Sequence, residues 1–539
     1  MKKFLAVVLC AATALAFASC TTAQTGTGGY ELRNGEAVIL ETGTDAPAPD
    51  DNARVFYEIF VGSFSDSDGD GIGDLRGIIG RMDYLNDGDP ASGLSLGVEG
   101  IWLTPIFASP SYHKYDVTDY YTIDPDFGTM DDLRELIALC HERGVKLILD
   151  LPVNHTGSLN ARFAEFCAAH AAGDAASPAY DLYAWRRADD PAKGGTWERI
   201  PGSGDLYECN FSPDMPELNF DSEAVRNELL DLARFYLDLG ADGFRFDAAK
   251  YVYYGNNERS ADFWKWYIGR LREIKPDIYT VAEVWDVEAV ADCYIPASNC
   301  FDFTAAGRDG IIARTARGEN VASFIAYTAR TLGNLRTLRD DAMPVYFIAN
   351  HDTDRAAGYL GAENGDMQMA ANLYILSPGS PFIYYGEELG MRGSRGASNT
   401  DANRRLAMLW GDEDTVRDPE GSTYGNQADT SVEIQKSDGE SLYSYYKRLL
   451  QLRRSHPEIA RGEYRPLVLR DTKLGGFVSD WEGKRVCVVH NNTGESLSVS
   501  LEELGAEGIS GLSAYIGSGE AGLTDGRLTV GPRTTAILR

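Results

Sequence analysis

The sequence predicts an α/β protein: a (β/α)₈ TIM barrel with an inserted subdomain after the third strand and a C-terminal β-sandwich. Eight apolar strand candidates alternate with helical segments over about 400 residues, which is the pattern of a parallel barrel. One interruption is rich in Gly, Pro, Tyr and Trp and is too long for an ordinary loop. The C-terminal part changes to short alternating strands, which indicate a separate β-domain.

The strand candidates are apolar runs bounded by turn residues, and they lie at 54–61, 98–106, 145–150, 244–246, 278–282, 300–303, 343–349 and 381–385. Helical spacing of apolar residues predicts helices over 130–143 and 222–239, the second with Asp221 as its N-cap. The expected domains are a barrel over 53–154 and 222–456, an inserted subdomain B over 155–221 and a sandwich over 457–539.

The N-terminus has the features of an export signal over residues 1–19: a basic start, an apolar run and small residues before Cys20. The small residues Ala18 and Ser19, followed directly by Cys20, resemble a bacterial lipobox, which implies lipidation of Cys20. An ordinary secretory signal is the alternative. We expect an exported protein, lipid-anchored to the bacterial cell envelope, with residues 20–52 as a flexible tether.

The charge balance narrows the range of ligands. The 539 residues include 81 acidic and 50 basic side chains, giving a formal charge of -31. Such a surface repels nucleic acid and suits a neutral ligand or a cation. No obligate protein partner is evident. Six cysteines follow Cys20 without CxxC pairs or zinc spacing, so buried free thiols are expected, with a local Cys293–Cys300 disulfide as the alternative.

Three acids directly follow apolar strands. Asp247 ends the strand 244–246, Glu283 ends 278–282, and Asp352 follows 343–349. In a parallel barrel the C-terminal ends of the strands form the active face, so the three carboxylates are expected to converge. Any one of them alone would more often be a structural residue at a strand end.

Crowded carboxylates repel one another, so at least one pKa should rise. A proton donor and a nucleophile can then coexist at neutral pH, as retaining glycoside hydrolysis requires of two carboxyl groups about 5–5.5 Å apart. Arg245, beside Asp247, would favour its ionised form. His155 and His351 lie at two further strand ends and could hydrogen-bond sugar hydroxyls.

Four segments, 150–155, 243–251, 283–285 and 350–352, resemble in order and spacing the four motifs of the α-amylase family of retaining glycoside hydrolases. Three supporting segments agree: 97–105 is similar to the family's second strand, 215–219 to its subdomain motif and 385–391 to its eighth-strand motif. The resemblance is to the amylase-like intermediate group, close to neopullulanase and oligo-1,6-glucosidase types.

The resemblance implies a role for each matching residue. Asp247 matches the nucleophile, Glu283 the general acid/base and Asp352 the stabiliser of the transition state. The positions matched to substrate contacts are Tyr115, Asp116, His155, Arg245, Lys250, His351 and Arg355. Tyr115 is expected to stack on the sugar ring at the cleavage point, and Lys250 to contact the leaving-group side.

An acidic loop after the first strand predicts a calcium site. Asp66, Asp68, Asp70 and Asp74 alternate with other residues, and Ile72 offers its carbonyl, as in an EF-hand loop. The twelfth position is Gly rather than Glu, so this is not an EF-hand. An acidic surface turn is the plain alternative. The loop resembles the calcium loop of oligosaccharide-cleaving members of the family, which implies structural calcium.

The substrate implied by the resemblance is an α-1,4-glucan or maltooligosaccharide, because a small residue, Ala248, follows the nucleophile. We expect endo-hydrolysis with retention. An exo-acting α-glucosidase or a transglycosylase is the alternative, and a non-catalytic glucan-binding lipoprotein is a third possibility. Thr353 departs from the family pattern near the cleft. Trp185, Trp197 and Tyr207 are either sugar platforms or the core of the subdomain.

Overall fold

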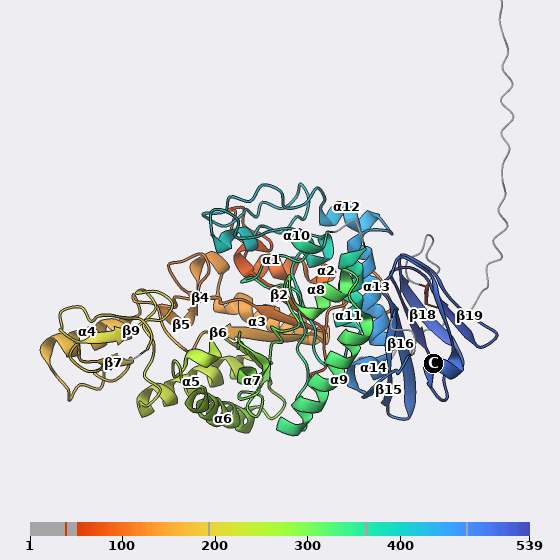
Figure 1. Ribbon diagram of the computed structural model, residues 1–539. Coiled ribbons are helices and arrows are strands. Elements are labelled where there is room, and N and C mark those ends of the chain that lie inside the picture. Colours follow the sequence, from red (N-terminus) through yellow and green to blue (C-terminus); the bar gives the residue numbers. More distant parts are fainter. Residues whose placement is uncertain (1–37, 40–50, 192–193, 362–364, 470–472) are drawn as a thin grey trace, which may run out of the picture.

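The computed structural model describes residues 38–39, 51–191, 194–361, 365–469 and 473–539 (Figure 1). The predicted signal sequence, Cys20 and most of the predicted tether lie outside these residues. Among the residues described, no helix combines the length and the hydropathy that a membrane span needs.

Seven parallel strands form the barrel sheet, in the spatial order β12-β11-β10-β6-β3-β2-β13. Their bounds are β2 Phe56–Ile59, β3 Gly100–Leu103, β6 Lys146–Leu151, β10 Gly243–Phe246, β11 Tyr279–Ala282, β12 Asn299–Cys300 and β13 Phe382–Tyr384. All seven lie within or overlap predicted strands.

The eighth predicted strand, 343–349, closes the barrel without forming a continuous ladder. It makes one isolated parallel bridge, between Val345 and Phe301. On one side the Val345 carbonyl accepts from Asp302 N at 3.0 Å, and on the other the Tyr346 carbonyl accepts from Phe382 N at 2.8 Å. The segment therefore stands between β12 and β13, where the eighth strand of a closed barrel belongs.

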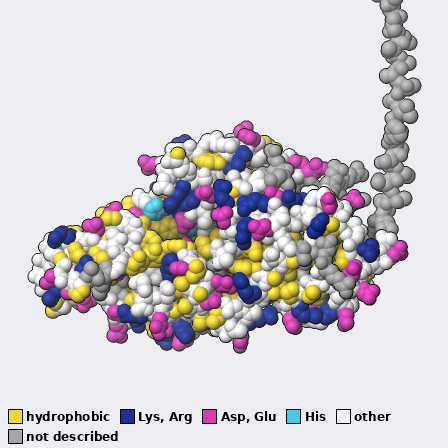
Figure 2. Space-filling view, in the orientation of Figure 1, with side chains coloured by type: hydrophobic (Ala, Val, Ile, Leu, Met, Phe, Trp, Pro, Cys, Tyr) yellow, Lys and Arg dark blue, Asp and Glu magenta, His cyan; other side chains and the backbone are white. Residues whose placement is uncertain are grey.

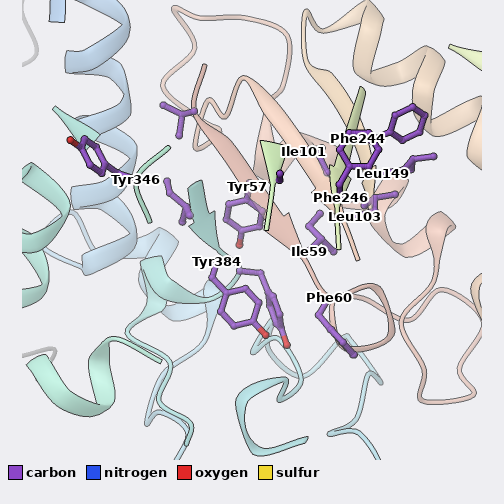
Figure 3. Close-up of a cluster of buried hydrophobic side chains, with 14 of the residues drawn as sticks. Tyr57, Ile59, Phe60, Ile101, Leu103, Leu149, Phe244, Phe246, Tyr346 and Tyr384 are labelled. Carbon is purple, nitrogen blue, oxygen red and sulfur yellow. The ribbon is translucent and has the colours of Figure 1, made fainter. Parts of the chain in front are cut away.

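Side chains alternate across the barrel wall because successive residues of a strand point to opposite faces. Phe244 and Phe246 belong to the main hydrophobic core together with residues of the surrounding helices, and Figure 3 shows them beside Leu149, Leu103 and Ile101. The barrel interior has its own apolar cluster, which includes Phe56, Trp102, Ile148, Val281, Phe347 and Phe382. Arg245, between the two outward phenylalanines, has its guanidinium 5.1 Å from the Trp102 ring. The charged groups at the C-terminal mouth of the barrel therefore lie next to an apolar barrel interior.

Helices cover the barrel. They are α1 Leu75–Gly80, α2 Met82–Leu85, α3 Met130–Glu142, α5 Glu223–Leu239, α6 Asn257–Ile274, α7 Glu288–Ala291, α8 Ile311–Ala316, α9 Val321–Leu338, α10 Ala357–Leu360, α11 Asp366–Ile375, α12 Val432–Ser437, α13 Leu442–Ser455 and α14 Pro457–Arg461. The predicted N-cap of α5 was wrong: Ser222 occupies that position, and Asp221 instead pairs with Arg259 at 2.6 Å.

The inserted subdomain projects from one end of the barrel (Figure 1). It contains α4 Ala161–Ala172 and a three-stranded antiparallel sheet in the order β7-β9-β8, with β7 Trp185–Arg186, β8 Trp197–Arg199 and β9 Leu206–Glu208. An isolated bridge between His155 and Glu217 ties its two ends together.

The C-terminal region consists of two antiparallel sheets, β1-β18-β21-β16-β15-β14 and β17-β20-β19. The strands are β14 Glu463–Pro466, β15 Leu474–Trp481, β16 Lys484–Asn491, β17 Leu497–Ser500, β18 Leu512–Gly517, β19 Ala521–Thr524, β20 Arg527–Val530 and β21 Thr534–Leu538. A short helix, α15 Leu501–Leu504, follows β17. The edge strand β1, Val38–Ile39, comes from the predicted tether and pairs with β18.

The six cysteines of the described residues are all free, so Cys293 and Cys300 form no disulfide. Cys140, Cys209, Cys300 and Cys487 are buried as expected, whereas Cys293 is exposed.

Candidate active site

A cavity of about 750 Å³ opens at the C-terminal ends of the barrel strands. Figure 2 shows a hollow with hydrophobic side chains where the projecting subdomain meets the barrel. Five of the predicted site residues line the cavity: Tyr115, His155, Asp247, Glu283 and Asp352. The three acids that follow three different strands therefore converge, as the strand-end argument predicts.

Arg245 holds two of these acids together. Its Nη1 donates to Asp247 Oδ1 at 2.7 Å, and its Nη2 lies 2.8 Å from Glu283 Oε2. Both nitrogens belong to one planar guanidinium, so the two carboxyl groups lie side by side. Retaining glycoside hydrolysis in general needs two neighbouring carboxyl groups, about 5–5.5 Å apart.

Ala248 connects the ends of β10 and β11 in a strained conformation. Its φ of 49° is in the left-handed region, which is uncommon for a residue with a Cβ. In this conformation Ala248 N donates to Glu283 Oε2 at 3.0 Å, and the next amide, Ala249 N, donates to the Glu283 carbonyl at 3.0 Å. The backbone after Asp247 thus fixes the position of Glu283.

Burial raises the pKa of Glu283 to about 8, and the charges of Asp247 and Asp352 add to this rise while Arg245 opposes it. Glu283 is 5% exposed, on the cavity wall. At neutral pH it is therefore protonated and able to donate. A general acid needs this state, and the burial of an acid among other carboxylates is the usual way to obtain it.

Asp352 is held in the opposite state. Burial alone would raise its pKa, but the charges of His351 and Arg405 keep the pKa of Asp352 well below its ordinary value. Arg405 Nη2 donates to Asp352 Oδ1 at 2.7 Å, and His351 Nε2 lies 3.1 Å from Asp352 Oδ2. Glu58, 2.6 Å from His351 Nδ1, helps to raise the pKa of His351 to about 10 against the effect of burial. Asp352 is therefore a fixed negative charge.

Tyr115 lines the cavity beside Asp352 and His351. Its hydroxyl donates to Asp150 Oδ2 at 2.9 Å and lies 2.8 Å from His351 Nε2. Both carboxylate oxygens of Asp150 also accept from Arg245 Nη1, each at 2.9 Å. One network therefore joins the tyrosine and Arg245 to the three strand-end acids, and it presents the tyrosine ring to the cavity.

The other predicted substrate contacts lie behind or beside the cavity and do not line it. Asp116 accepts from the hydroxyls of Ser109 and Ser111. Arg355 donates to the carbonyls of Tyr385 and Arg404. Asp116 and Arg355 therefore stabilise loops near the cavity. Lys250 donates to the Trp285 carbonyl at 3.1 Å, so it supports a ring that does line the cavity.

Sequence reasoning missed several residues of the site. Glu58 contacts His351 and Arg405 contacts Asp352, and a segment with Arg395, Asn399, Thr400 and Asp401 lines one wall. Glu58 lies on β2, two residues after the inward-facing Phe56, so strand alternation could have found it. Arg405 follows no strand, so the rule that finds residues at strand ends could not assign it to the site.

The acidic loop brings part of the predicted calcium site together. Ligand oxygens of Asp66, Asp68 and Asp74 lie within 4.8 Å of one another, a donor set that suits a hard cation such as Ca²⁺. Asp74 also caps α1 by accepting from Gly77 N at 2.7 Å. Asp70 is not in this group, and its Oδ1 accepts from Ile72 N at 2.7 Å.

A parallel barrel with an adjacent acid pair and a third, permanently charged carboxylate at its C-terminal mouth is the arrangement of a glycoside hydrolase. The family described as "Alpha amylase, catalytic domain" matches residues 58–462. The chain belongs to this family, and it is an enzyme of the amylase type.

Relatives within the family carry more than one activity in their names. The chain is 35% identical over 444 residues to Alpha-amylase 3 of Dictyoglomus thermophilum, covering 81% of this chain and 84% of that protein. It is 31% identical over 468 residues to a 4-alpha-glucanotransferase of Thermotoga maritima, covering 82% and 96%. The solved structure of Eubacterium rectale Amy13B has a TM-score of 0.83, with 32% identity, covering 92% of this chain and 96% of that one.

Proposed function

We propose that this enzyme hydrolyses internal α-1,4-glucosidic bonds of starch-like glucans and maltooligosaccharides with retention of configuration. The observation that carries the proposal is the acid pair on one guanidinium, with Glu283 protonated and Asp247 2.7 Å from Arg245. The name of the 35% identical relative supports the amylase assignment.

The reaction then proceeds in two displacements. Glu283 donates its proton to the glycosidic oxygen while a carboxylate oxygen of Asp247 attacks the anomeric carbon, so the bond to the leaving sugar breaks and a glycosyl-enzyme ester forms. Glu283, now a carboxylate, takes a proton from water, and the water oxygen attacks the same carbon and releases Asp247. Two inversions give net retention.

Asp352 contributes through its fixed negative charge. The transition state of glycoside cleavage resembles an oxocarbenium ion, whose positive charge develops on the sugar ring. A carboxylate fixed by Arg405 and His351 costs no reorganisation when that charge appears. Tyr115, bonded to Asp150, gives the ring a flat surface to pack against.

The shape of the cavity favours endo-cleavage. Its lining continues from Asp352 to Arg395 and Asp401, and from Glu283 to Trp285 and Phe211. Sugar units then have room on both sides of the acid pair. A blind pocket that holds one terminal sugar would favour exo-cleavage.

Product analysis on maltoheptaose and starch tests the proposal. Endo-hydrolysis releases maltooligosaccharides of several lengths from the first minutes. Glucose alone at early times would contradict it and favour the α-glucosidase reading. Products longer than the substrate would favour glucan transfer, the activity that the name of the Thermotoga maritima relative states.

We also propose that calcium binds the loop of Asp66, Asp68 and Asp74 in a structural role, and that Cys20 anchors the exported protein to the cell envelope through a lipid. Three converging carboxylates support the first proposal. The sequence before Cys20 supports the second. Replacing Cys20 with Ser should move the protein from the membrane to the soluble fraction, and an unchanged membrane fraction would contradict the anchor.

A further inference from the structure

The inserted subdomain carries a second recess, of about 450 Å³, outside the catalytic cavity. Trp185 of β7, Trp197 of β8 and Tyr254 line it, together with polar side chains that include Glu208 and Asn219. Aromatic faces next to carboxylate and amide groups suit a sugar chain, whose C–H faces pack on rings and whose hydroxyls form hydrogen bonds.

A row of aromatic rings joins this recess to the catalytic cavity. Phe211 and Trp285 line the cavity, and both contact Tyr251, with ring centroids 4.7 Å and 5.3 Å away. Tyr251 in turn lies 5.3 Å from Tyr254, which lines the second recess. Ring contacts through Tyr251 therefore link the lining of the catalytic cavity to the lining of the second recess.

Both ends of the row are open to solvent. Phe211 is 42% exposed and Tyr254 is 45% exposed, so both are large hydrophobic side chains that the described part of the chain leaves open to solvent. Scattered exposed rings are ordinary, but exposed rings along one path between two recesses indicate a binding surface.

The aromatic rings of the row and of the second recess are held in place by their neighbours. Tyr254 packs against the backbone of Gly195, where an added Cβ would lie 3.3 Å from the tyrosine ring. Trp197 Nε1 donates to the Gly194 carbonyl at 2.9 Å. The Lys250 ammonium lies 4.9 Å from the centre of the Trp285 ring. A platform fixed in advance loses little side-chain entropy when a ligand binds.

We propose that the second recess binds the leaving-group end of the same α-glucan chain whose scissile bond lies in the catalytic cavity. The proposal rests on the proposed function for the identity of the ligand. The direction follows from Glu283, the proton donor to the leaving sugar, because Trp285 lies two residues beyond it and begins the row. Tyr254 and Trp197 then set the preference for long chains.

The test compares kcat/KM on a long substrate, maltoheptaose or amylose, with kcat/KM on maltotriose. In Tyr254→Ala and Trp197→Ala the ratio of long to short should fall about three- to tenfold, the loss expected for one aromatic packing contact. Tyr254→Phe keeps the ring and should keep the wild-type ratio. Tyr121→Ala, which removes a 44% exposed tyrosine far along the chain from the row, is the matched control.

A wild-type ratio in Tyr254→Ala would overturn the proposal, and so would an equal loss on both substrates. Tyr254 is half exposed, so this variant decides the question even where Trp197→Ala fails to fold. Failure of the proposed function gives a different result: the wild-type enzyme would then cleave neither substrate, release glucose alone at early times, or form products longer than the substrate.

Discussion

In the proposed mechanism Glu283 meets two requirements that conflict in water: it must hold a proton at neutral pH and still lie next to an attacking carboxylate. Burial satisfies the first, and Arg245 keeps the pair together despite their repulsion. The guanidinium is itself surrounded by Asp150, Asp247 and Glu283 and is fully buried. Removing Arg245 would leave several buried acids without their shared counterion.

The raised pKa of Glu283 predicts the alkaline limit of activity. The acid must be protonated to act, so kcat/KM should fall about tenfold for each unit of pH above about 8, where Glu283 loses its proton. A pH profile of kcat/KM on maltoheptaose measures this limit. An alkaline limit near pH 5, the ordinary range of a glutamic acid, would contradict the assignment.

Arg405 is predicted to position Asp352. It donates to Asp352 Oδ1, to the His351 carbonyl at 3.1 Å and to the Tyr112 hydroxyl at 3.1 Å. Arg405→Met should lower kcat/KM about ten- to a hundredfold, the worth of a charged hydrogen bond. Loss of the positive charge should also raise the pKa of Asp352 and move the acid limit of the pH profile upward.

The matched control for Arg405 is Arg395→Met, because Arg395 lines the same cavity but pairs with Asp401. An Arg405 variant with a lower melting temperature and an unmoved acid limit would show a purely structural role.

At the scale of elements, the acidic loop after β2 is tied to a distant segment of the chain. Asp66 accepts from Thr415 Oγ1, and its amide donates to Asp414 Oδ1 at 3.3 Å. The same segment continues to Asp418, which accepts from Ala407 N two residues after Arg405. Order in the loop therefore supports the segment that holds Arg405.

Calcium is accordingly predicted to stabilise the fold. Protein freed of metal with a chelator should have a lower melting temperature, and added Ca²⁺ should restore it, because a ligand that binds only the native state stabilises it. Asp66→Asn should abolish the calcium-dependent shift, while Asp189→Asn, at an exposed aspartate of the subdomain, should keep it. A shift that persists in Asp66→Asn would contradict this location.

Hydrophobic periodicity predicted most of the elements because buried strands are continuous apolar runs in a parallel barrel. The segment 343–349 was predicted as a strand and is an isolated bridge, and Pro344, which lacks an amide donor, helps to explain the missing ladder. Strand β1 could not be predicted from two residues, since its pairing depends on β18 more than four hundred positions away.

The candidate site was predictable where a residue follows a strand directly, as Asp247, Glu283 and Asp352 do. Other residues of the site are brought together only by the closed barrel. Arg405 contacts Asp352 although the two residues are more than fifty positions apart in the chain. Asp116 was expected at the substrate and turns to Ser109 and Ser111, because neighbouring residues of a loop need not share a direction.

At the scale of the whole molecule, the two proposals together assign the chemistry to the barrel and the length of the binding surface to the inserted subdomain. The acids come from three barrel strand ends, whereas Phe211 and Trp197 come from the insertion. The division follows from the fold: a barrel mouth fixes side chains rigidly, and an insertion after one strand can extend the mouth in one direction.

The most direct test of the central claim is to trap the glycosyl-enzyme in the Glu283→Gln variant. An activated substrate such as α-maltotriosyl fluoride needs little help from an acid, while loss of the base slows release of the ester, so the intermediate should accumulate. Mass spectrometry should then find a maltotriosyl adduct on the peptide that contains Asp247. No adduct, an adduct on another residue, or full activity of the variant on maltoheptaose would contradict the assignment of Asp247 and Glu283.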